Sequence, residues 1–179
     1  MNKLNPDIMR LVTLTLITFL IAGCTATSVG TAFDDTRNES LAKQRIKEAH
    51  SGLADSHVSV TSFGGVVLLT GQVPSQDLIA IATAAVEPLR NVTRVHNELV
   101  VAGETSFLSK TNDSWLTTKV KSALSKDESS DASRIKVVTE NGVVYMMGLL
   151  TRAEADAAVE ITRDIQGVQK IVKVFDYIN

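Results

Sequence analysis

The same sequence pattern occurs twice in this chain of 179 residues. Segment 58–73 (VSVTSFGGVVLLTGQV) aligns without a gap with segment 135–150 (IKVVTENGVVYMMGLL). Shorter matches flank this pair: NESLA (38–42) with NDSWL (112–116), and LRNV (89–92) with IQGV (165–168). The spacing between matched residues changes from 74 to 77 to 76 along the chain, so the insertions fall in loops. The duplication predicts two copies of one small domain.

Each copy is predicted to run helix, hairpin, helix, strand. Asn112 or Ser114 is expected to cap the first helix of the second copy. The apolar face of that helix repeats at i, i+4, i+7 and i+8 and consists of Leu116, Val120, Ala123 and Leu124. The hairpins are expected to turn at Gly64–Gly65 and Asn141–Gly142, because these residues adopt the positive φ that a two-residue turn requires. The predicted fold is α+β, with two αββαβ units in which two helices pack on a three-stranded sheet.

The ends of the hairpins and the starts of the second helices carry local signals. Gly71 and Gly148 are expected to end the second strand of each hairpin. Segments PSQD (74–77) and TRAE (151–154) are then expected to open Ala-rich helices, the latter with a capping-box pattern.

The remaining strands are placed by their apolar patterns. Final strands are predicted at about 92–101 and 168–178. The second hairpin strands (66–69 and 143–147) are apolar on both faces. They are therefore expected to be central in their sheets or covered by the sister domain.

The first 23 residues are predicted to be a secretory signal peptide. Lys3 and Arg10 precede an uncharged stretch at 11–22. A helix of that length rises only about 18 Å, too short for a bilayer core of roughly 30 Å. The pattern of basic start, apolar middle and small residues at the end is typical of a secretion signal.

The signal ends in Ile21-Ala22-Gly23-Cys24, which resembles the bacterial lipobox. This resemblance implies cleavage before Cys24 and attachment of diacylglycerol, with fatty acids such as palmitate, to its thiol. Thr25 stands where an Asp typically retains Gram-negative lipoproteins at the inner membrane, and so implies the outer membrane. Residues 24–37 are small and polar without a period and are expected to form a lipidated tether.

No residue pattern indicates an enzyme, a metal site or a cofactor. The net charge of −2 argues against general nucleic-acid binding, which needs a basic surface. His50, His57 and His96 share no metal-ligand spacing. The acidic segment 127–131 lacks the glycine and spaced carboxylates of a calcium loop and is predicted to be a solvated connection.

The repeated motifs resemble those of a known family. Both hairpins fit the pattern VxVxxxxGxVxLxGxV, and NVTRVHN (91–97) and GVQKIV (167–172) fit a GVxxVxN ending, apart from Val172-Lys173 where an Asn is usual. Duplicated αββαβ units with these motifs resemble BON domains. With the lipobox, residues 20–179 resemble the dual BON-domain outer-membrane lipoproteins of Gram-negative bacteria. The expected domains are 38–101 and 112–179, joined by a linker at 102–111.

The first helix of the second copy carries the only tryptophan of the chain. On a helical wheel, Trp115 lies about 100° from the core direction of Leu116. It shares one strip with Lys119, Ser122 and Lys126. The strip taken as equivalent in the first copy has no aromatic residue and includes one acid; it consists of Leu41, Arg45, Glu48 and Gly52.

Two interpretations of this tryptophan remain open from the residues alone. The residues favour packing of the ring against its own sheet or the first domain. The other interpretation is contact with an anionic bilayer, because indole prefers the headgroup region and each lysine adds about 1 kcal/mol.

The family resemblance implies the membrane interpretation. Its expected ligand is anionic phospholipid, bound through Trp115, Leu116, Lys119, Ser122 and Lys126. The implied protein is an outer-membrane lipoprotein that faces the periplasm and supports envelope integrity. The alternative is a periplasmic interaction module or chaperone-like adaptor for an envelope protein.

Overall fold

The computed structural model describes residues 26–102, 107–127, 129 and 131–178. The predicted signal peptide, Cys24 and Thr25 lie outside the described residues. Among the described residues, no helix is both long and apolar enough to cross a membrane.

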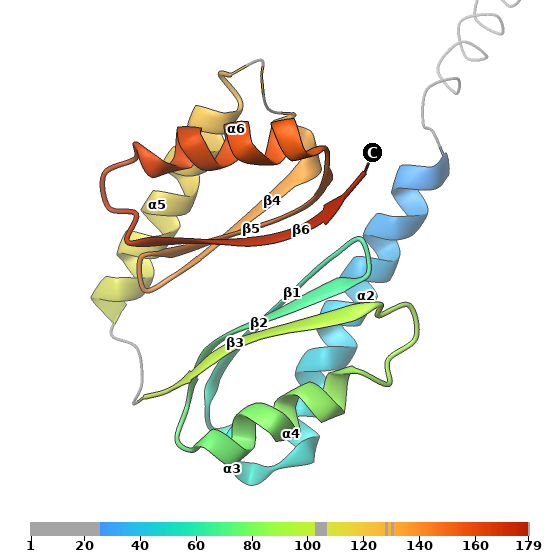
Figure 1. Ribbon diagram of the computed structural model, residues 1–179. Helices are drawn as coiled ribbons and strands as arrows, with labels where there is room; N and C mark the ends of the chain where they lie inside the picture. The colour runs from blue at the N-terminus through green and yellow to red at the C-terminus, as the bar shows by residue number, and fades with distance from the viewer. Residues whose placement is uncertain (1–25, 103–106, 128, 130, 179) are drawn as a thin grey trace, which may run out of the picture.

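Two units with the predicted order of helix, hairpin, helix and strand follow each other along the chain (Figure 1). The first consists of α2 (Ala26–Ala49), the short α3 (Ser51–Ala54), β1 (His57–Phe63), β2 (Val66–Val73), α4 (Gln76–Val86) and β3 (Arg94–Val101). The second consists of α5 (Phe107–Leu124), the 3-10 turn η1 (Ala132–Arg134), β4 (Ile135–Glu140), β5 (Val143–Leu150), α6 (Arg152–Arg163) and β6 (Lys170–Tyr177). The α+β fold with two αββαβ units is thus confirmed.

Each unit has a three-stranded sheet with its second strand in the centre, in the orders β1-β2-β3 and β4-β5-β6. The hairpin strands are antiparallel, and the third strand runs parallel to the second. Both hairpins close through two residues of positive φ, at Gly64–Gly65 and at Asn141–Gly142. The predicted turns are therefore confirmed.

An aspartate on the first helix of each unit holds the hairpin turn. The Asp35 carboxylate accepts hydrogen bonds from the backbone N–H groups of Gly64 (2.8 Å) and Gly65 (3.1 Å). The Asp113 carboxylate accepts the same pair of bonds from Asn141 (2.7 Å) and Gly142 (2.8 Å). Backbone donors that the tight turn leaves unpaired are satisfied in this way.

These contacts correct the alignment of the two first helices. The aspartates Asp35 and Asp113 are 78 residues apart, not 74, and so are the buried residues of the two helices. Those residues are Asn38, Ala42 and Ile46 in α2 and Leu116, Val120 and Leu124 in α5. The match of NESLA with NDSWL is therefore wrong by one helical turn.

The first helices also begin earlier than predicted. α5 starts at Phe107, so residues 107–111 of the expected linker are helical, and Asn112 and Ser114 lie inside the helix rather than at its cap. α2 starts at Ala26 and includes most of the expected tether. The polar composition suggested loops, but both segments continue the first helices toward the N-terminus, and Asp35 in the expected tether binds the hairpin turn.

Gly71 and Gly148 do not end the second strands, which continue for two more residues. A Cβ atom on Gly71 would lie 2.0 Å from the carbonyl oxygen of His57, and one on Gly148 would lie 2.6 Å from that of Arg134. The glycines are needed because the start of the neighbouring strand approaches closely.

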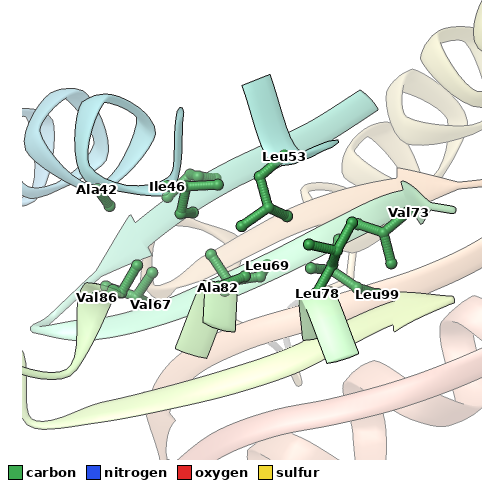
Figure 2. Packing of buried hydrophobic residues seen from close by; sticks show 11 residues of the cluster. Ala42, Ile46, Leu53, Val67, Leu69, Val73, Leu78, Ala82, Val86 and Leu99 are labelled. Carbon is green, nitrogen blue, oxygen red and sulfur yellow. The ribbon is translucent and has the colours of Figure 1, made fainter. Parts of the chain in front are cut away.

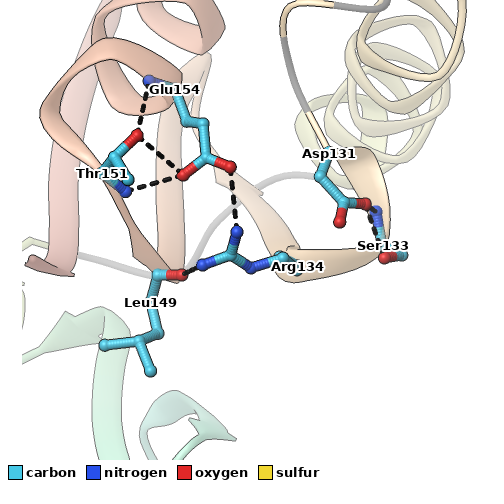
Figure 3. A network of polar contacts seen from close by, with 6 residues as sticks. All are labelled: Asp131, Ser133, Arg134, Leu149, Thr151 and Glu154. Atoms are coloured by element: carbon cyan, nitrogen blue, oxygen red, sulfur yellow. Dashed lines mark hydrogen bonds and ion pairs between the residues drawn. The ribbon is translucent and has the colours of Figure 1, made fainter. Parts of the chain in front are cut away.

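The second helices begin as expected. Thr151 caps α6 by accepting a bond from the Glu154 N–H, and the Glu154 carboxylate accepts one from the Thr151 N–H, which confirms the capping box (Figure 3). These bonds from Thr151 lower the pKa of Glu154. Arg134 pairs with the same carboxylate at 2.9 Å and donates to the Leu149 carbonyl, which ties the end of β5 to the helix. α4 begins at Gln76 after Ser75, which makes no side-chain capping bond.

Each unit has its own hydrophobic core between its sheet and its helices. In the first, buried side chains from α2, α3, β2, α4 and β3 meet (Figure 2). In the second, Leu116, Val120 and Leu124 of α5 pack against Val144 and Met146 of β5, together with residues of β4, α6 and β6. These cores fix the rotation of α2 and α5 about their axes.

A third apolar cluster lies between the units. The two sheets face each other, and the helices cover their outer sides (Figure 1). The buried members of the cluster are Val66, Leu68, Tyr145, Met147 and Val174. Burial, with further contributions from Glu98 and Glu140, raises the pKa of Tyr145 to about 12. The second hairpin strands were predicted to be central in their sheets or covered by the sister domain. They are central and are also covered by the other unit.

Candidate functional site

The single tryptophan lies on the outer surface of the second unit. Trp115 is 56% exposed, whereas Leu116, the next residue, is 1% exposed and belongs to the core. The Lys119 ammonium lies 3.9 Å from the centre of the indole ring, as in a cation–π contact. The ring therefore packs neither on its own sheet nor on the first unit.

A groove of about 560 Å³ runs beside this ring. One wall is α5 with the turn that follows it, and it carries the side chains four, seven and eleven residues after Trp115. The other wall is the connection from α6 to β6. The lining residues are Trp115, Thr118, Lys119, Ser122, Ala123, Lys126, Asp164, Ile165 and Gln166.

Four of the five predicted site residues are thus brought together: Trp115, Lys119, Ser122 and Lys126. Leu116 is not among them, because its side chain points into the core and is inaccessible to a ligand. Its role is to set the rotation of α5, which turns the neighbouring Trp115 outward. We therefore remove Leu116 from the predicted contact residues.

The second wall of the groove was missed from the sequence. The chain leaves α6 in tight turns, with bonds from Ile165 N to Thr162 O and from Val168 N to Ile165 O, both 3.2 Å. Gly167 has a φ of 108°, and a Cβ there would lie 3.6 Å from a methyl group of Leu116. The loop is thereby held close to α5. The match of IQGV with LRNV was the only sequence signal for this segment.

The groove offers a mixed apolar and cationic surface. Lys119 and Lys126 face one carboxylate, Asp164, while Thr118, Ser122 and Gln166 provide neutral hydrogen-bonding groups. The aromatic ring and Ile165 provide the apolar part. Such a surface fits a ligand that is anionic at one end and apolar at the other.

The first unit lacks this combination. With the corrected alignment, Trp115, Lys119, Ser122 and Lys126 correspond to Arg37, Leu41, Gln44 and Glu48. This corrected set contains one acid, one base and no aromatic ring. It replaces the set predicted from the sequence, which was Leu41, Arg45, Glu48 and Gly52.

The histidines are dispersed and serve local roles. His50 accepts a bond from the Gly52 N–H at the start of α3. His57 lies 3.6 Å from Glu140 across the two units. Burial, and then the nearby Arg94, lower the pKa of His96. The described part of the chain contains no group of three metal-ligating side chains.

Comparison with known proteins shows similarity over most of the chain. The family described as BON domain matches residues 34–103 and 112–179. Outer membrane lipoprotein DolP of Haemophilus influenzae is 39% identical over 152 residues, covering 85% of this chain and 79% of that protein. The 21 kDa hemolysin of Actinobacillus pleuropneumoniae is 33% identical over 151 residues, covering 84% and 78%. Osmotically-inducible protein Y of Escherichia coli is 29% identical over 146 residues, covering 80% and 72%.

Proposed function

The chain belongs to the BON-domain family, and we propose that it is a lipid-anchored protein of the outer membrane whose second domain binds anionic phospholipid. It faces the periplasm and supports the integrity of the envelope. The similarity to an outer membrane lipoprotein supports the envelope-associated role. The groove beside Trp115 is the proposed lipid contact.

The lipid anchor is supported by the lipobox at residues 21–24. Each buried methylene of an acyl chain contributes about 0.8 kcal/mol, so attached fatty acids hold the protein firmly at the membrane. Replacing Cys24→Ala should remove the lipid and leave a periplasmic or uncleaved chain. Metabolic labelling with a palmitate analogue measures this, and label that persists in the variant would contradict the anchor.

The observation that carries the lipid contact is an exposed tryptophan with a lysine over its ring. An indole ring kept in water loses the stabilisation that burial would give, about 25 cal/mol for each Å² of apolar surface. At a bilayer the ring enters the headgroup region, and Lys119 and Lys126 each contribute about 1 kcal/mol next to anionic lipid.

Vesicle binding tests the lipid contact directly. Residues 26–179, which lack the acylated cysteine, should co-sediment with phosphatidylglycerol vesicles and only weakly with phosphatidylcholine vesicles. Salt should weaken the binding, because it screens the lysines. The tryptophan fluorescence should shift to the blue, since Trp115 is its only source. Absence of binding to either vesicle would refute the lipid contact and favour the adaptor function.

A further inference from the structure

The most exposed large hydrophobic side chain among the described residues is Phe33 of α2, at 73%. It lies outside the first core, whose α2 members are Ala42 and Ile46. The corrected alignment pairs it with Thr111 of the second domain, which is also exposed. Because the equivalent position carries a polar residue, the BON fold does not require an aromatic ring there.

Phe33 lies one helical turn before Arg37, the residue that corresponds to Trp115. Phe33 and Arg37 are both exposed and share one face of α2. The two domains thus each carry an aromatic side chain and a cation four residues apart on the outer face of the first helix. The ring precedes the cation in both domains, and in the corrected alignment the ring of the first domain lies one helical turn closer to the start of its helix.

The position of this pair along the chain suggests its partner. Seven residues of helix from Ala26 to Phe33 rise about 10.5 Å. The two peptide steps from Cys24 to Ala26 span at most about 7 Å even when fully extended. Phe33 is therefore within about 18 Å of the cysteine. Figure 1 shows the first turns of α2 continuing past the β1–β2 hairpin.

The acidic residues near Phe33 and Arg37 repel anionic lipid only weakly. The Asp35 carboxylate is used in the hairpin turn, where it accepts bonds from two backbone N–H groups and from Ser62. Asp34 is half-buried and lies about 100° around the helix from Phe33. Arg37 therefore remains as the exposed charged side chain on the same face of α2 as Phe33.

We infer that Phe33 and Arg37 form a second lipid contact, which docks the start of α2 on the bilayer that holds the acyl chains of Cys24. One ring and one arginine are too weak to bind a membrane from solution, since an arginine contributes about 1 kcal/mol. The anchor makes the contact intramolecular and raises the effective concentration of the surface. The inference rests on the proposed lipidation, and it holds the first domain at a short, fixed distance from the membrane.

Single-tryptophan chains test the inference. The full lipidated chain with Trp115→Phe and Phe33→Trp is reconstituted in phosphatidylethanolamine–phosphatidylglycerol vesicles that contain brominated lipid, after mass spectrometry confirms acylation. The matched control is Trp115→Phe with Gln44→Trp, which places the probe on the same face of α2 about 16 Å farther along the helix. The probe at position 33 should be blue-shifted and quenched several-fold more strongly than the probe at 44. The extra quenching should disappear when Cys24→Ala is added.

Equal quenching at positions 33 and 44 would overturn the inference, and so would quenching at 33 that persists without the lipid. An unacylated full chain would overturn it together with the anchor. The unsubstituted chain, read through Trp115 in the same vesicles, reports the groove separately. Quenching of Trp115 without quenching at 33 sinks this inference alone, whereas the reverse sinks only the proposed groove contact.

Discussion

The two domains of this chain share the contacts that define their fold and differ on the outer face of their first helix. Both tie that helix to the hairpin through an aspartate, Asp35 or Asp113. The buried helix positions also correspond, although Asn38 occupies the site of Leu116. On the outer face, a ring and two lysines in the second domain correspond to a cluster of mixed charge in the first.

This difference indicates where function has diverged. Positions in the core and at the turn are constrained by burial and hydrogen bonding, so most of them keep an apolar or a turn-forming residue in both copies. Exposed helix positions carry no such constraint. A surface on which only one copy collects an exposed tryptophan and lysines is therefore the place to expect a domain-specific ligand.

Substitution of Gly71 or Gly148, which neighbouring backbone approaches closely, should have the largest effect on stability. Gly71→Ala forces a methyl group against the His57 carbonyl at a φ of 121° and should cost about 4 kcal/mol, enough to unfold the first domain. Gly148→Ala should cost less, because the corresponding distance is 2.6 Å and no positive φ is needed. Chemical denaturation measures both free energies of unfolding. Gly64→Ala, which has open space around it, is the control and should cost about 1 kcal/mol.

Loss of the aspartate that holds each hairpin turn should have a smaller effect on the free energy of unfolding, and the effect should differ between the domains. Asp113 is 6% exposed and Asp35 is half-buried, so loss of the carboxylate leaves better-hidden N–H groups in the second domain. Asp113→Ala should cost about 3 kcal/mol and Asp35→Ala about 2 kcal/mol. Equal losses in thermal denaturation, or a larger loss for Asp35, would contradict the burial argument.

Between pH 7 and pH 5, the first domain should show a pH effect that arises from His96. The pKa of His96 is lowered by burial and by Arg94, while Glu98 and, from β6, Asp176 raise it in part. The unfolded chain therefore takes up this proton first, so His96 should reduce stability as the pH falls below about 6.5. The equivalent residue of the second domain is Val172, which does not titrate. His96→Val should flatten the fall in melting temperature between pH 7 and pH 5; an unchanged slope would contradict this assignment.

The sequence predicted what depends on local or periodic signals. Gly64–Gly65 and Asn141–Gly142 close turns through their own φ values, and the apolar second strands could occupy only buried positions. The same periodicity placed Lys119, Ser122 and Lys126 beside Trp115. These features need no knowledge of distant contacts.

The parts that were missed depend on contacts between distant segments. The true alignment of α2 with α5 follows from the bonds of Asp35 and Asp113 to turns about 30 residues away, which a match of polar letters does not reveal. The groove wall at 164–166 belongs to a different element from α5 and approaches it only in the fold. The core face of α5 at Leu116, Val120 and Leu124 was predicted correctly, but the exposure of Trp115 at the edge of that face depends on whether another element covers it, which only the fold shows.

Vesicle co-sedimentation of three charge variants tests the difference between the domains most directly. Ser122→Glu and Gln44→Glu add the same charge at equivalent exposed positions of the two helices, and Trp115→Glu also removes the ring. In residues 26–179, Trp115→Glu should weaken binding to phosphatidylglycerol vesicles by more than about tenfold. Ser122→Glu should weaken it by about fivefold, and Gln44→Glu should leave it nearly unchanged. Circular dichroism should show the same fold in all three. Equal losses for Ser122→Glu and Gln44→Glu, or a folded Trp115→Glu chain that still binds, would contradict the account.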